Sequence, residues 1–276
     1  MSKIELIQGD CLEKMRDIPD GSIDMILCDL PYGTTACKWD TIIPFEPLWE
    51  QYKRIIKDNG AIVLTASQPF TSALVMSNIK MFKYEWVWNK NKGSNIMLAK
   101  KQPLKIHENV LVFGGRNYFP QKTKIEGKVR KQNEEVKTKK WQNRDDGAVS
   151  PKKTVKYAED YNPQERYPVS IQYFPNHREK EKVFHPTQKP VALFEYLIKT
   201  YTKENETVLD NCMGSGTTGV ACKKLNRNFI GIELDPEYFK IAEKRINENH
   251  KGNKRVFPDR GRKGLFLRAF GKRNIH

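Results

Sequence analysis

The chain has 276 residues, 38% hydrophobic and 11% aromatic, which suffices for a packed core and argues against wholesale disorder. Lysine and arginine exceed the acidic residues by 16, a surplus that an enzyme of small metabolites does not need and that binding to a phosphate polymer uses. No run approaches the ~18 apolar residues of a membrane span, and the amino terminus has the pattern of a strand rather than of a signal peptide. We therefore expect a cytoplasmic protein with no membrane partner.

Short apolar runs alternate with helix-like segments along most of the chain, with no internal repeat. This alternation predicts an α/β fold with a doubly wound, mostly parallel, Rossmann-like sheet. Strands are expected at Ile4–Gln8, Ile23–Cys28, Ala61–Leu64, Tyr84–Trp88, Asn109–Phe113, Thr207–Leu209 and Asn228–Ile232, and helices at Phe45–Ile56, Pro69–Asn78, Val191–Tyr201, Thr217–Lys224 and Pro236–Asn249.

The first motif, Asp29-Leu30-Pro31-Tyr32, follows the strand-like run Ile23–Cys28. It puts a carboxylate, a rigid proline and an aromatic ring in a row where a strand ends. Such a cluster is either a capped turn or one wall of a binding site. The five cysteines form no C-x-x-C pair, so neither a disulfide scaffold nor a metal site is expected.

A strongly basic stretch interrupts the regular pattern in the middle of the chain. Residues 116–160 contain thirteen lysines and arginines against seven acids, with interspersed aromatic residues and little apolar periodicity. This composition suits phosphate contact and base stacking, and it also suits a mobile charged loop. Residues 251–276 form a second basic segment, with nine lysines and arginines and one acid.

The second motif runs from Val208 to Phe239 and has the order strand, glycine turn, helix, strand, acid. Gly214 and Gly216 allow the backbone to pass close to a ligand at the head of a helix. Glu233, at the end of the next strand, is suited to hold a ribose through its hydroxyls. No Gly-Lys-Ser/Thr follows the turn, and Asp210 would repel a pyrophosphate but accept from an ammonium group. A nucleoside with a cationic amino-acid end, such as S-adenosylmethionine, fits better than a dinucleotide.

The two motifs together resemble those of the β-class DNA amino-methyltransferases. Asp29-Leu30-Pro31-Tyr32 is similar to the family's D-P-P-Y signature, and "DNCMGSGTT" from Asp210 is similar to its D-P-F-x-G-S-G-T-T cofactor turn. "HPTQKPVALFEYLIK" from His185 and "IQGDCLEKM" from Ile7 resemble two further segments of that family. The order of motifs is the circularly permuted one of the β class. Leu30 in place of proline and Asn211-Cys212-Met213 in place of P-F-x are departures that leave the chemical groups intact.

The resemblance implies a division of the chain into four parts: a catalytic half at residues 1–115, an inserted target-recognition region at 116–180, a cofactor-binding half at 181–250 and a basic tail at 251–276. It also implies site residues. The catalytic ones are Asp29, Pro31 and Tyr32. The cofactor-binding ones are Asp10, Cys11, Asp29, Thr187, Lys189, Asp210, Gly214, Ser215, Gly216, Thr217 and Glu233.

The function implied is methyl transfer from S-adenosylmethionine to the N6 amine of an adenine that has left the stack of double-stranded DNA. Asp29 and a carbonyl of the Leu30–Pro31 segment would accept from the amine, and Tyr32 would stack on the base. An aspartate at the head of the signature favours adenine N6 over cytosine N4, which is the alternative. A non-catalytic DNA-binding module and an enzyme of RNA or of a protein amide are more remote. The family also implies a homodimer and a cognate restriction endonuclease as partners.

Overall fold

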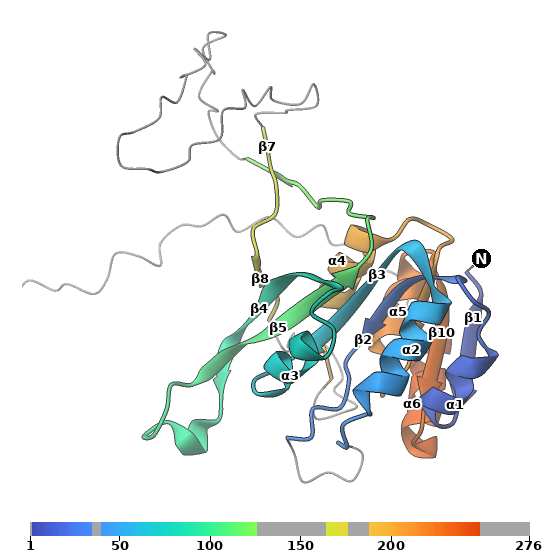
Figure 1. Cartoon of the computed structure of the whole chain (residues 1–276). Helices are drawn as coiled ribbons and strands as arrows, with labels where there is room; N and C mark the ends of the chain where they lie inside the picture. The colour runs from blue at the N-terminus through green and yellow to red at the C-terminus, as the bar shows by residue number, and fades with distance from the viewer. Residues whose placement is uncertain (1, 35–39, 126–163, 176–187, 249–276) are drawn as a thin grey trace, which may run out of the picture. The chain divides into compact units, whose positions relative to one another are not determined.

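The computed structural model describes residues 2–34, 40–125, 164–175 and 188–248 (Figure 1). The chain divides into two compact units, one of residues 1–121 with 169–250 and one of residues 122–168 with 251–276. Most of the basic stretch at 116–160, the whole basic tail at 251–276 and the predicted site residue Thr187 lie outside the described residues. No helix in the described ranges is long and apolar enough to cross a membrane.

The larger unit is built on one eight-stranded sheet. Its order is β1-β10-β9-β2-β3-β5-β4-β8, and all neighbours are parallel except that β5 runs antiparallel to β3 and to β4. The strands are β1 Ile4–Gln8, β2 Ile23–Cys28, β3 Ile56–Ala66, β4 Phe82–Ser94, β5 Lys105–Gly114, β8 Ile171–Tyr173, β9 Thr207–Asp210 and β10 Asn228–Glu233.

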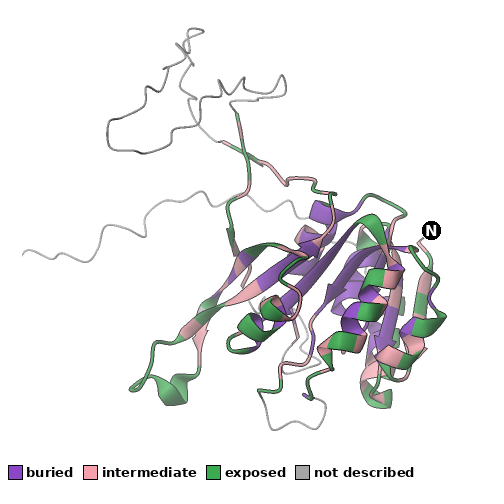
Figure 2. Ribbon diagram, in the orientation of Figure 1, coloured by how far each residue is buried: buried purple, intermediate pink, exposed green. Residues whose placement is uncertain are grey.

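Helices cover both faces of this sheet, as the doubly wound pattern predicts. On one face, α4 (Val191–Tyr201), α5 (Thr217–Lys224) and α6 (Pro236–Asn247) pack on Met25 and Leu27 of β2. On the other, α1 (Cys11–Lys14), α2 (Phe45–Ile55) and α3 (Phe70–Ser77) pack on Ile26 and Cys28 of the same strand. The central strands are buried on both sides, which explains why every residue of β2 except Asp24 is apolar (Figure 2).

The short elements of the larger unit are η1 (Met15–Asp17) after α1 and η2 (Ile96–Leu98) between β4 and β5. The smaller unit is described only around β6 (Thr123–Lys124) and β7 (Glu165–Arg166), which pair antiparallel. An ion pair of 3.5 Å between Lys122 and Glu165 flanks this pairing.

The expected strand–helix alternation and the mostly parallel sheet are confirmed. The differences are in extent: β3, β4 and β5 are longer than expected, and β8 and α1 were not predicted. β4 and β5 form a long antiparallel hairpin whose outer residues alternate poorly between apolar and polar, so periodicity marks only their inner halves. β2 and β9, which carry the two motifs 180 residues apart in sequence, are hydrogen-bonded neighbours.

Candidate active site

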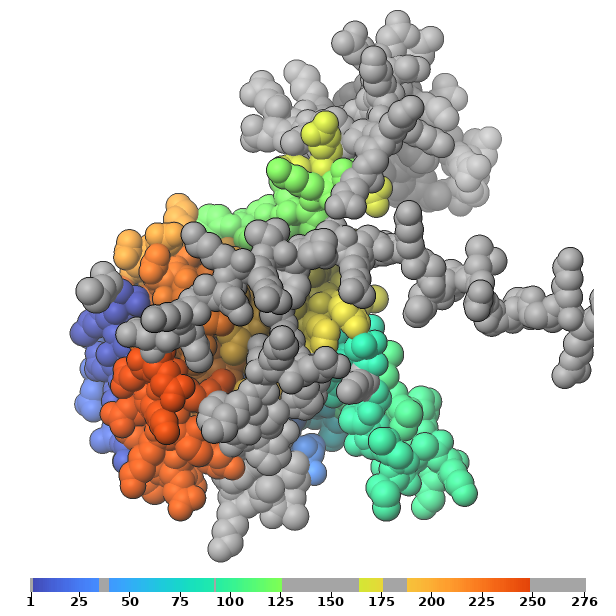
Figure 3. Space-filling view, turned by 180° about the vertical axis from the view of Figure 1, so that it is seen from behind, coloured from blue at the N-terminus to red at the C-terminus, as the bar shows by residue number. Residues whose placement is uncertain are grey.

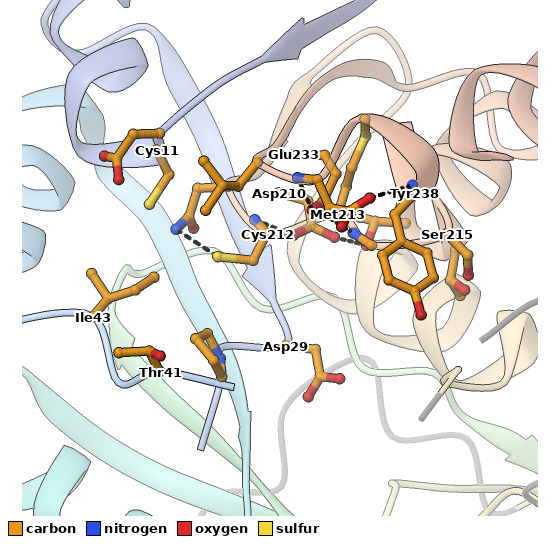
Figure 4. Close-up of a pocket in the computed structure, with 18 of the residues that line it drawn as sticks. Cys11, Asp29, Thr41, Ile43, Asp210, Cys212, Met213, Ser215, Glu233 and Tyr238 are labelled. Carbon is orange, nitrogen blue, oxygen red and sulfur yellow. Dashed lines mark hydrogen bonds between the residues drawn. The ribbon is translucent and has the colours of Figure 1, made fainter. Parts of the chain in front are cut away.

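The two motifs border one cavity of about 650 Å³ at the carboxyl edge of the parallel strands, the edge at which open α/β sheets bind ligands. Its volume lies within the range of small-molecule sites. Figure 4 shows Asp210, Met213 and Glu233 grouped on one side and Asp29 apart from them. The predicted site residues that line the cavity are Asp10, Cys11, Asp29, Pro31, Lys189, Asp210, Gly214, Ser215, Thr217 and Glu233.

Asp210 ends β9 at the floor of this cavity and is almost fully buried. One carboxylate oxygen accepts from the Cys212 amide at 3.1 Å and the other from the Thr218 hydroxyl. Because burial outweighs these donors, the pKa of Asp210 rises to about 7. No ion pair to Asp210 occurs among the described residues, so its carboxylate can accept a proton or a cationic ligand group.

Glu233 ends β10, the neighbouring strand, and is held by backbone amides. One oxygen accepts from the Gly214 amide at 2.8 Å and the other from the Asp235 amide at 2.9 Å. Burial raises the pKa of this carboxyl against the opposing effect of the two amides. The contact with Gly214 joins the acid to the glycine turn, so both move as one unit of the site.

The glycine turn lies between β9 and α5, and its two glycines differ in role. Gly214 has a φ of 50°, and a Cβ there would meet nothing within 4 Å, so its backbone faces the open cavity. Gly216 has a φ of 80° and is the residue before α5. A Cβ on Gly216 would press on Ala242 and Ile246 of α6 at 3.0 Å, so this glycine allows helix packing and does not line the cavity.

A second helix start borders the cavity next to β1. Asp10 caps α1 by accepting from the Leu12 amide at 2.8 Å and the Glu13 amide at 3.3 Å. A hydrogen bond with Cys212 and then burial raise the pKa of the Cys11 thiol, so it remains protonated. This edge of the cavity is therefore lined by the carboxylate of Asp10, which caps α1, and by the neutral thiol of Cys11.

Asp29 follows β2 and its carboxylate is surrounded by donors. Its Oδ1 accepts from the Tyr32 hydroxyl at 2.8 Å and from the Thr65 hydroxyl at the end of β3. Its Oδ2 lies 2.5 Å from Lys189 Nζ, just before α4. The Tyr32 ring stacks on Phe70 with centroids 5.2 Å apart. The carboxylate is thus fixed in position although the side chain is 24% exposed.

Lys189 continues into a chain of alternating charges. It lies 3.6 Å from Glu108 Oε2 at the start of β5, and the other oxygen of Glu108 accepts from Lys90 of β4 at 2.9 Å. Burial alone would lower the pKa of Lys189, but the carboxylates of Asp29 and Glu108 outweigh it and the pKa is raised. Lys189 therefore remains a cation beside Asp29.

Two predicted site residues within the described ranges stand apart from the cavity wall. Tyr32 lies behind Asp29 and contacts it through the hydroxyl, and Gly216 packs on α6 as described. Thr187 lies outside the described residues. Lys189 does line the cavity, yet its hydrogen bond is to the carboxylate of Asp29, whereas the family resemblance implies a cofactor contact.

Sequence reasoning missed Glu108, Asn211 and the apolar wall of the cavity. Glu108 lies in no motif, and only the strand order brings it to Lys189. Asn211 is buried and accepts from the Tyr52 hydroxyl of α2 at 2.6 Å, so the residue that replaces the family's proline ties the turn to the opposite face. Leu30, which replaces the other proline, is 3% exposed and packs in the core under α2. The apolar lining of the cavity includes Ile42, Ile43, Phe194, Met213, Leu234 and Tyr238.

The donor set of the cavity fits S-adenosylmethionine. The exposed Gly214 backbone and the carboxylates of Asp210 and Glu233 can receive the ammonium and hydroxyl groups of such a ligand, and the apolar wall can receive its base. Within the described ranges, no three His, Cys, Asp or Glu side chains are placed to hold a metal ion.

Comparisons with known proteins agree with this arrangement. A family model described as DNA methylase, covering N6 and N4 methyltransferases, matches residues 23–244. The Type II methyltransferase M.HinfI of Haemophilus influenzae is 29% identical over 273 residues, covering 88% of this chain and 68% of its own length. The DNA adenine methyltransferase YhdJ of Escherichia coli (strain K12) is 30% identical over 261 residues, covering 88% of this chain and 82% of its own.

A solved structure, that of M1.HpyAVI in complex with SAM, matches 88% of this chain and 99% of its own with a TM-score of 0.59 and 26% identity. The match of the family model extends over both motifs, from the start of β2 to the last turns of α6. The chain therefore belongs to the DNA methylase family and is an S-adenosylmethionine-dependent DNA methyltransferase.

Proposed function

We propose that this protein methylates the N6 amine of adenine in double-stranded DNA, on a base that has left the stack. The observation that carries the proposal is the position of Asp29, a fixed carboxylate that lines the same cavity as the glycine turn. YhdJ, the relative at 30% identity, is named a DNA adenine methyltransferase. The aspartate at the head of the D-L-P-Y motif supports the same choice over cytosine N4.

The chemistry requires acceptors for the target amine, because its lone pair is delocalised into the ring. S-adenosylmethionine, when bound, would supply an electrophilic methyl group, and its sulfur would keep the electron pair of the broken S–CH3 bond and leave as a neutral thioether. Asp29 accepts one N–H of the amine and a carbonyl of the Leu30–Pro31 segment accepts the other, which localises the lone pair on nitrogen as the N–C bond forms. The carboxylate of Asp29 is the nearest acceptor for the proton that the nitrogen then loses.

Lys189 has a positioning role in this proposal rather than a role in holding the cofactor. Its Nζ donates to Oδ2 of Asp29, whereas the Tyr32 and Thr65 hydroxyls donate to Oδ1. An incoming amine displaces Nζ towards Glu108, whose nearby oxygen is buried and accepts no hydrogen bond in the described structure. Lys189 therefore has a carboxylate beside it in both states, that of Asp29 without the base and that of Glu108 with it.

The remaining assignments rest on the cavity and on the family. Asp10, Cys11, Thr187, Asp210, Gly214, Ser215, Thr217 and Glu233 form the cofactor site, with Gly216 shaping the turn, and residues 116–180 recognise the target sequence. M.HinfI is named a Type II methyltransferase, which supports a cognate restriction endonuclease as a partner. Homodimer formation is a further part of the proposal, and sedimentation equilibrium tests it.

The test is nucleoside mass spectrometry of unmethylated genomic DNA incubated with the protein and S-adenosylmethionine. We expect N6-methyladenine with the wild type and none with Asp29→Ala. The matched control is Asp58→Asn, which changes an exposed acid at the start of β3, at the opposite edge of the sheet. N4-methylcytosine would retain the mechanism and overturn the choice of base. The absence of any methylated base would contradict the proposed function.

A further inference from the structure

The β4–β5 hairpin extends past the carboxyl edge of the sheet, the edge that holds the cavity. Asn89 pairs with His107 next to the ion pair of Lys90 and Glu108, and beyond a register shift Ser94 pairs with Lys105, so the two strands continue outward past the ion pair. Figures 1 and 3 show this teal and green hairpin projecting from the body of the larger unit. Residues 91–104 form the hairpin tip.

The hairpin tip is a built structure that exposes apolar side chains. Met97 is 96% exposed and Ile96 73%, and Leu98 and Leu104 are also exposed. Yet the backbone is held: the Leu98 amide donates to Asn95 O at 2.9 Å, and the Ser94 hydroxyl donates to Lys105 O at 2.9 Å across the hairpin. An apolar tip held out into solvent by its own hydrogen bonds indicates a contact surface.

The charge of the hairpin tip indicates which partner it meets. Residues 91–104 contain three lysines (Lys92, Lys100 and Lys101) and no aspartate or glutamate. The side chains of Lys100 and Lys101 are exposed. A second copy of a chain with a net charge of +16 would oppose this tip with charge of the same sign, whereas DNA attracts it.

The root of the hairpin tip is connected to the catalytic carboxylate. Lys90 pairs with Glu108, Glu108 with Lys189, and Lys189 with Asp29. Met97 is seven residues after Lys90, which limits the distance between them to at most about 23 Å at ~3.3 Å per residue. This is less than one turn of duplex DNA, about 34 Å. A duplex that presents a base to Asp29 therefore passes within reach of the tip.

We propose that the hairpin tip is a wedge that contacts DNA next to the target base. Lys100 and Lys101 pair with phosphates, and Ile96 and Met97 press on the bases that border the gap left by the extruded adenine. Apolar side chains are used in this way to hold unstacked steps open, and lysines supply affinity that depends on salt. The inference rests on the proposed function for the identity of the target base, but the DNA contact is testable without it.

Two double variants separate the two parts of the wedge, and each has a matched control. Lys100→Gln with Lys101→Gln is compared with Lys80→Gln with Lys83→Gln, which removes the same charge at the opposite end of β4. Ile96→Ser with Met97→Ser is compared with Met76→Ser with Ile79→Ser, an exposed apolar pair at and just after the end of α3. Circular dichroism confirms that all four variants are folded.

The lysine pair is tested by binding of a fluorescein-labelled 30-base-pair duplex of mixed sequence over a series of NaCl concentrations. We expect the slope of log affinity against log salt to decrease by about 2 for the tip pair, because each lost phosphate contact removes ~0.9. The control pair should leave the slope unchanged. An unchanged slope for the tip pair, or an equal decrease for the control pair, overturns the phosphate contact.

The apolar pair is tested by methyl transfer to unmethylated genomic DNA, used as duplex and after strand separation. We expect a loss of about tenfold or more on the duplex and of less than about twofold on single strands, because a single strand needs no unstacking. Equal losses on both substrates, or no loss, overturn the wedge. Conversion of a dimer to a monomer by this pair, with duplex activity retained, would assign the tip to self-association. If the wild type transfers no methyl group, the proposed function fails and the salt series still decides the DNA contact.

Discussion

The ends of β2 and β9 are neighbours in the sheet, yet they present two very different carboxylates. Asp29 is partly exposed, with a lysine 2.5 Å away and two hydroxyl donors. Asp210 is buried, accepts from the Cys212 amide and the Thr218 hydroxyl, and has a pKa raised to about 7. The difference teaches that one site can hold two acids for two tasks, because environment rather than residue type sets what each can bind.

Among substitutions of the residues around the two acids, Lys189→Met should have the largest effect, and it acts on the side of Asp29. We expect the methyl-transfer rate at saturating cofactor to fall about 100-fold, because the Asp29 carboxylate loses the neighbouring cation that holds it in position until the amine arrives. The dissociation constant of S-adenosylmethionine should change less than about threefold. Rapid-quench kinetics and calorimetry measure the two quantities. A larger effect on cofactor affinity than on rate would return Lys189 to the cofactor site. The control is Lys224→Met, which removes the ion pair between Lys224 of α5 and Glu195 of α4 at the surface.

On the side of Asp210, cofactor affinity is expected to depend on pH. The ionised carboxylate attracts the ammonium group of S-adenosylmethionine, and the pKa of Asp210 is raised to about 7. Affinity should therefore be about tenfold weaker at pH 6 than at pH 8, since the ionised fraction falls about tenfold per pH unit below the pKa. Calorimetric titration at both pH values measures it. Asp210→Asn should bind weakly with no such dependence, and a similar pH profile in that variant would contradict the assignment.

The same titration predicts an effect on stability in the absence of cofactor. The folded pKa of Asp210 lies above its ordinary value, so its contribution to stability is fully present below about pH 4 and is lost as pH rises through about 7. Asp210→Asn cannot ionise. The melting temperature of the variant minus that of the wild type should therefore rise by about 5 °C between pH 5 and pH 8. Differential scanning calorimetry measures this difference, and a fall would show that burial does not control Asp210.

The smallest expected effect is that of Leu30→Pro, which restores the proline of the family signature. The substitution leaves the side chains of Asp29, Pro31 and Tyr32 unchanged, so the methyl-transfer rate should stay within about threefold of the wild type. Stability should fall by about 1–3 kcal/mol, because Leu30 is 3% exposed in the core. Steady-state kinetics and urea denaturation provide the two numbers. A large loss of rate with stability intact would make Leu30 part of the chemistry.

The fold and the location of the site could be predicted because they depend on local patterns. The apolar run of β2, the glycines before α5 and Glu233 at the end of β10 are each visible within about ten residues of sequence. The parallel order then brings their ends together at one edge, where the cavity lies.

The charge chain could not be predicted, because its members are far apart in sequence and lie in no common pattern. Lys189 and Asp29 are separated by 160 positions, and Glu108 meets them only because β5 runs antiparallel to β3. The extent of the β4–β5 hairpin was missed for a related reason. Its outer residues bury little, so they lack the apolar alternation that marks a strand.

The most direct test of the central claim is the single-turnover rate of methyl transfer to unmethylated genomic DNA, measured at rising S-adenosylmethionine concentration for Asp29→Asn and Asp210→Asn. If Asp29 acts on the amine and Asp210 on the cofactor, saturation should restore the rate of Asp210→Asn to within about tenfold of the wild type. Asp29→Asn should remain about 1,000-fold slower at every concentration. Recovery of Asp29→Asn at high cofactor concentration would contradict the division of labour between the two acids.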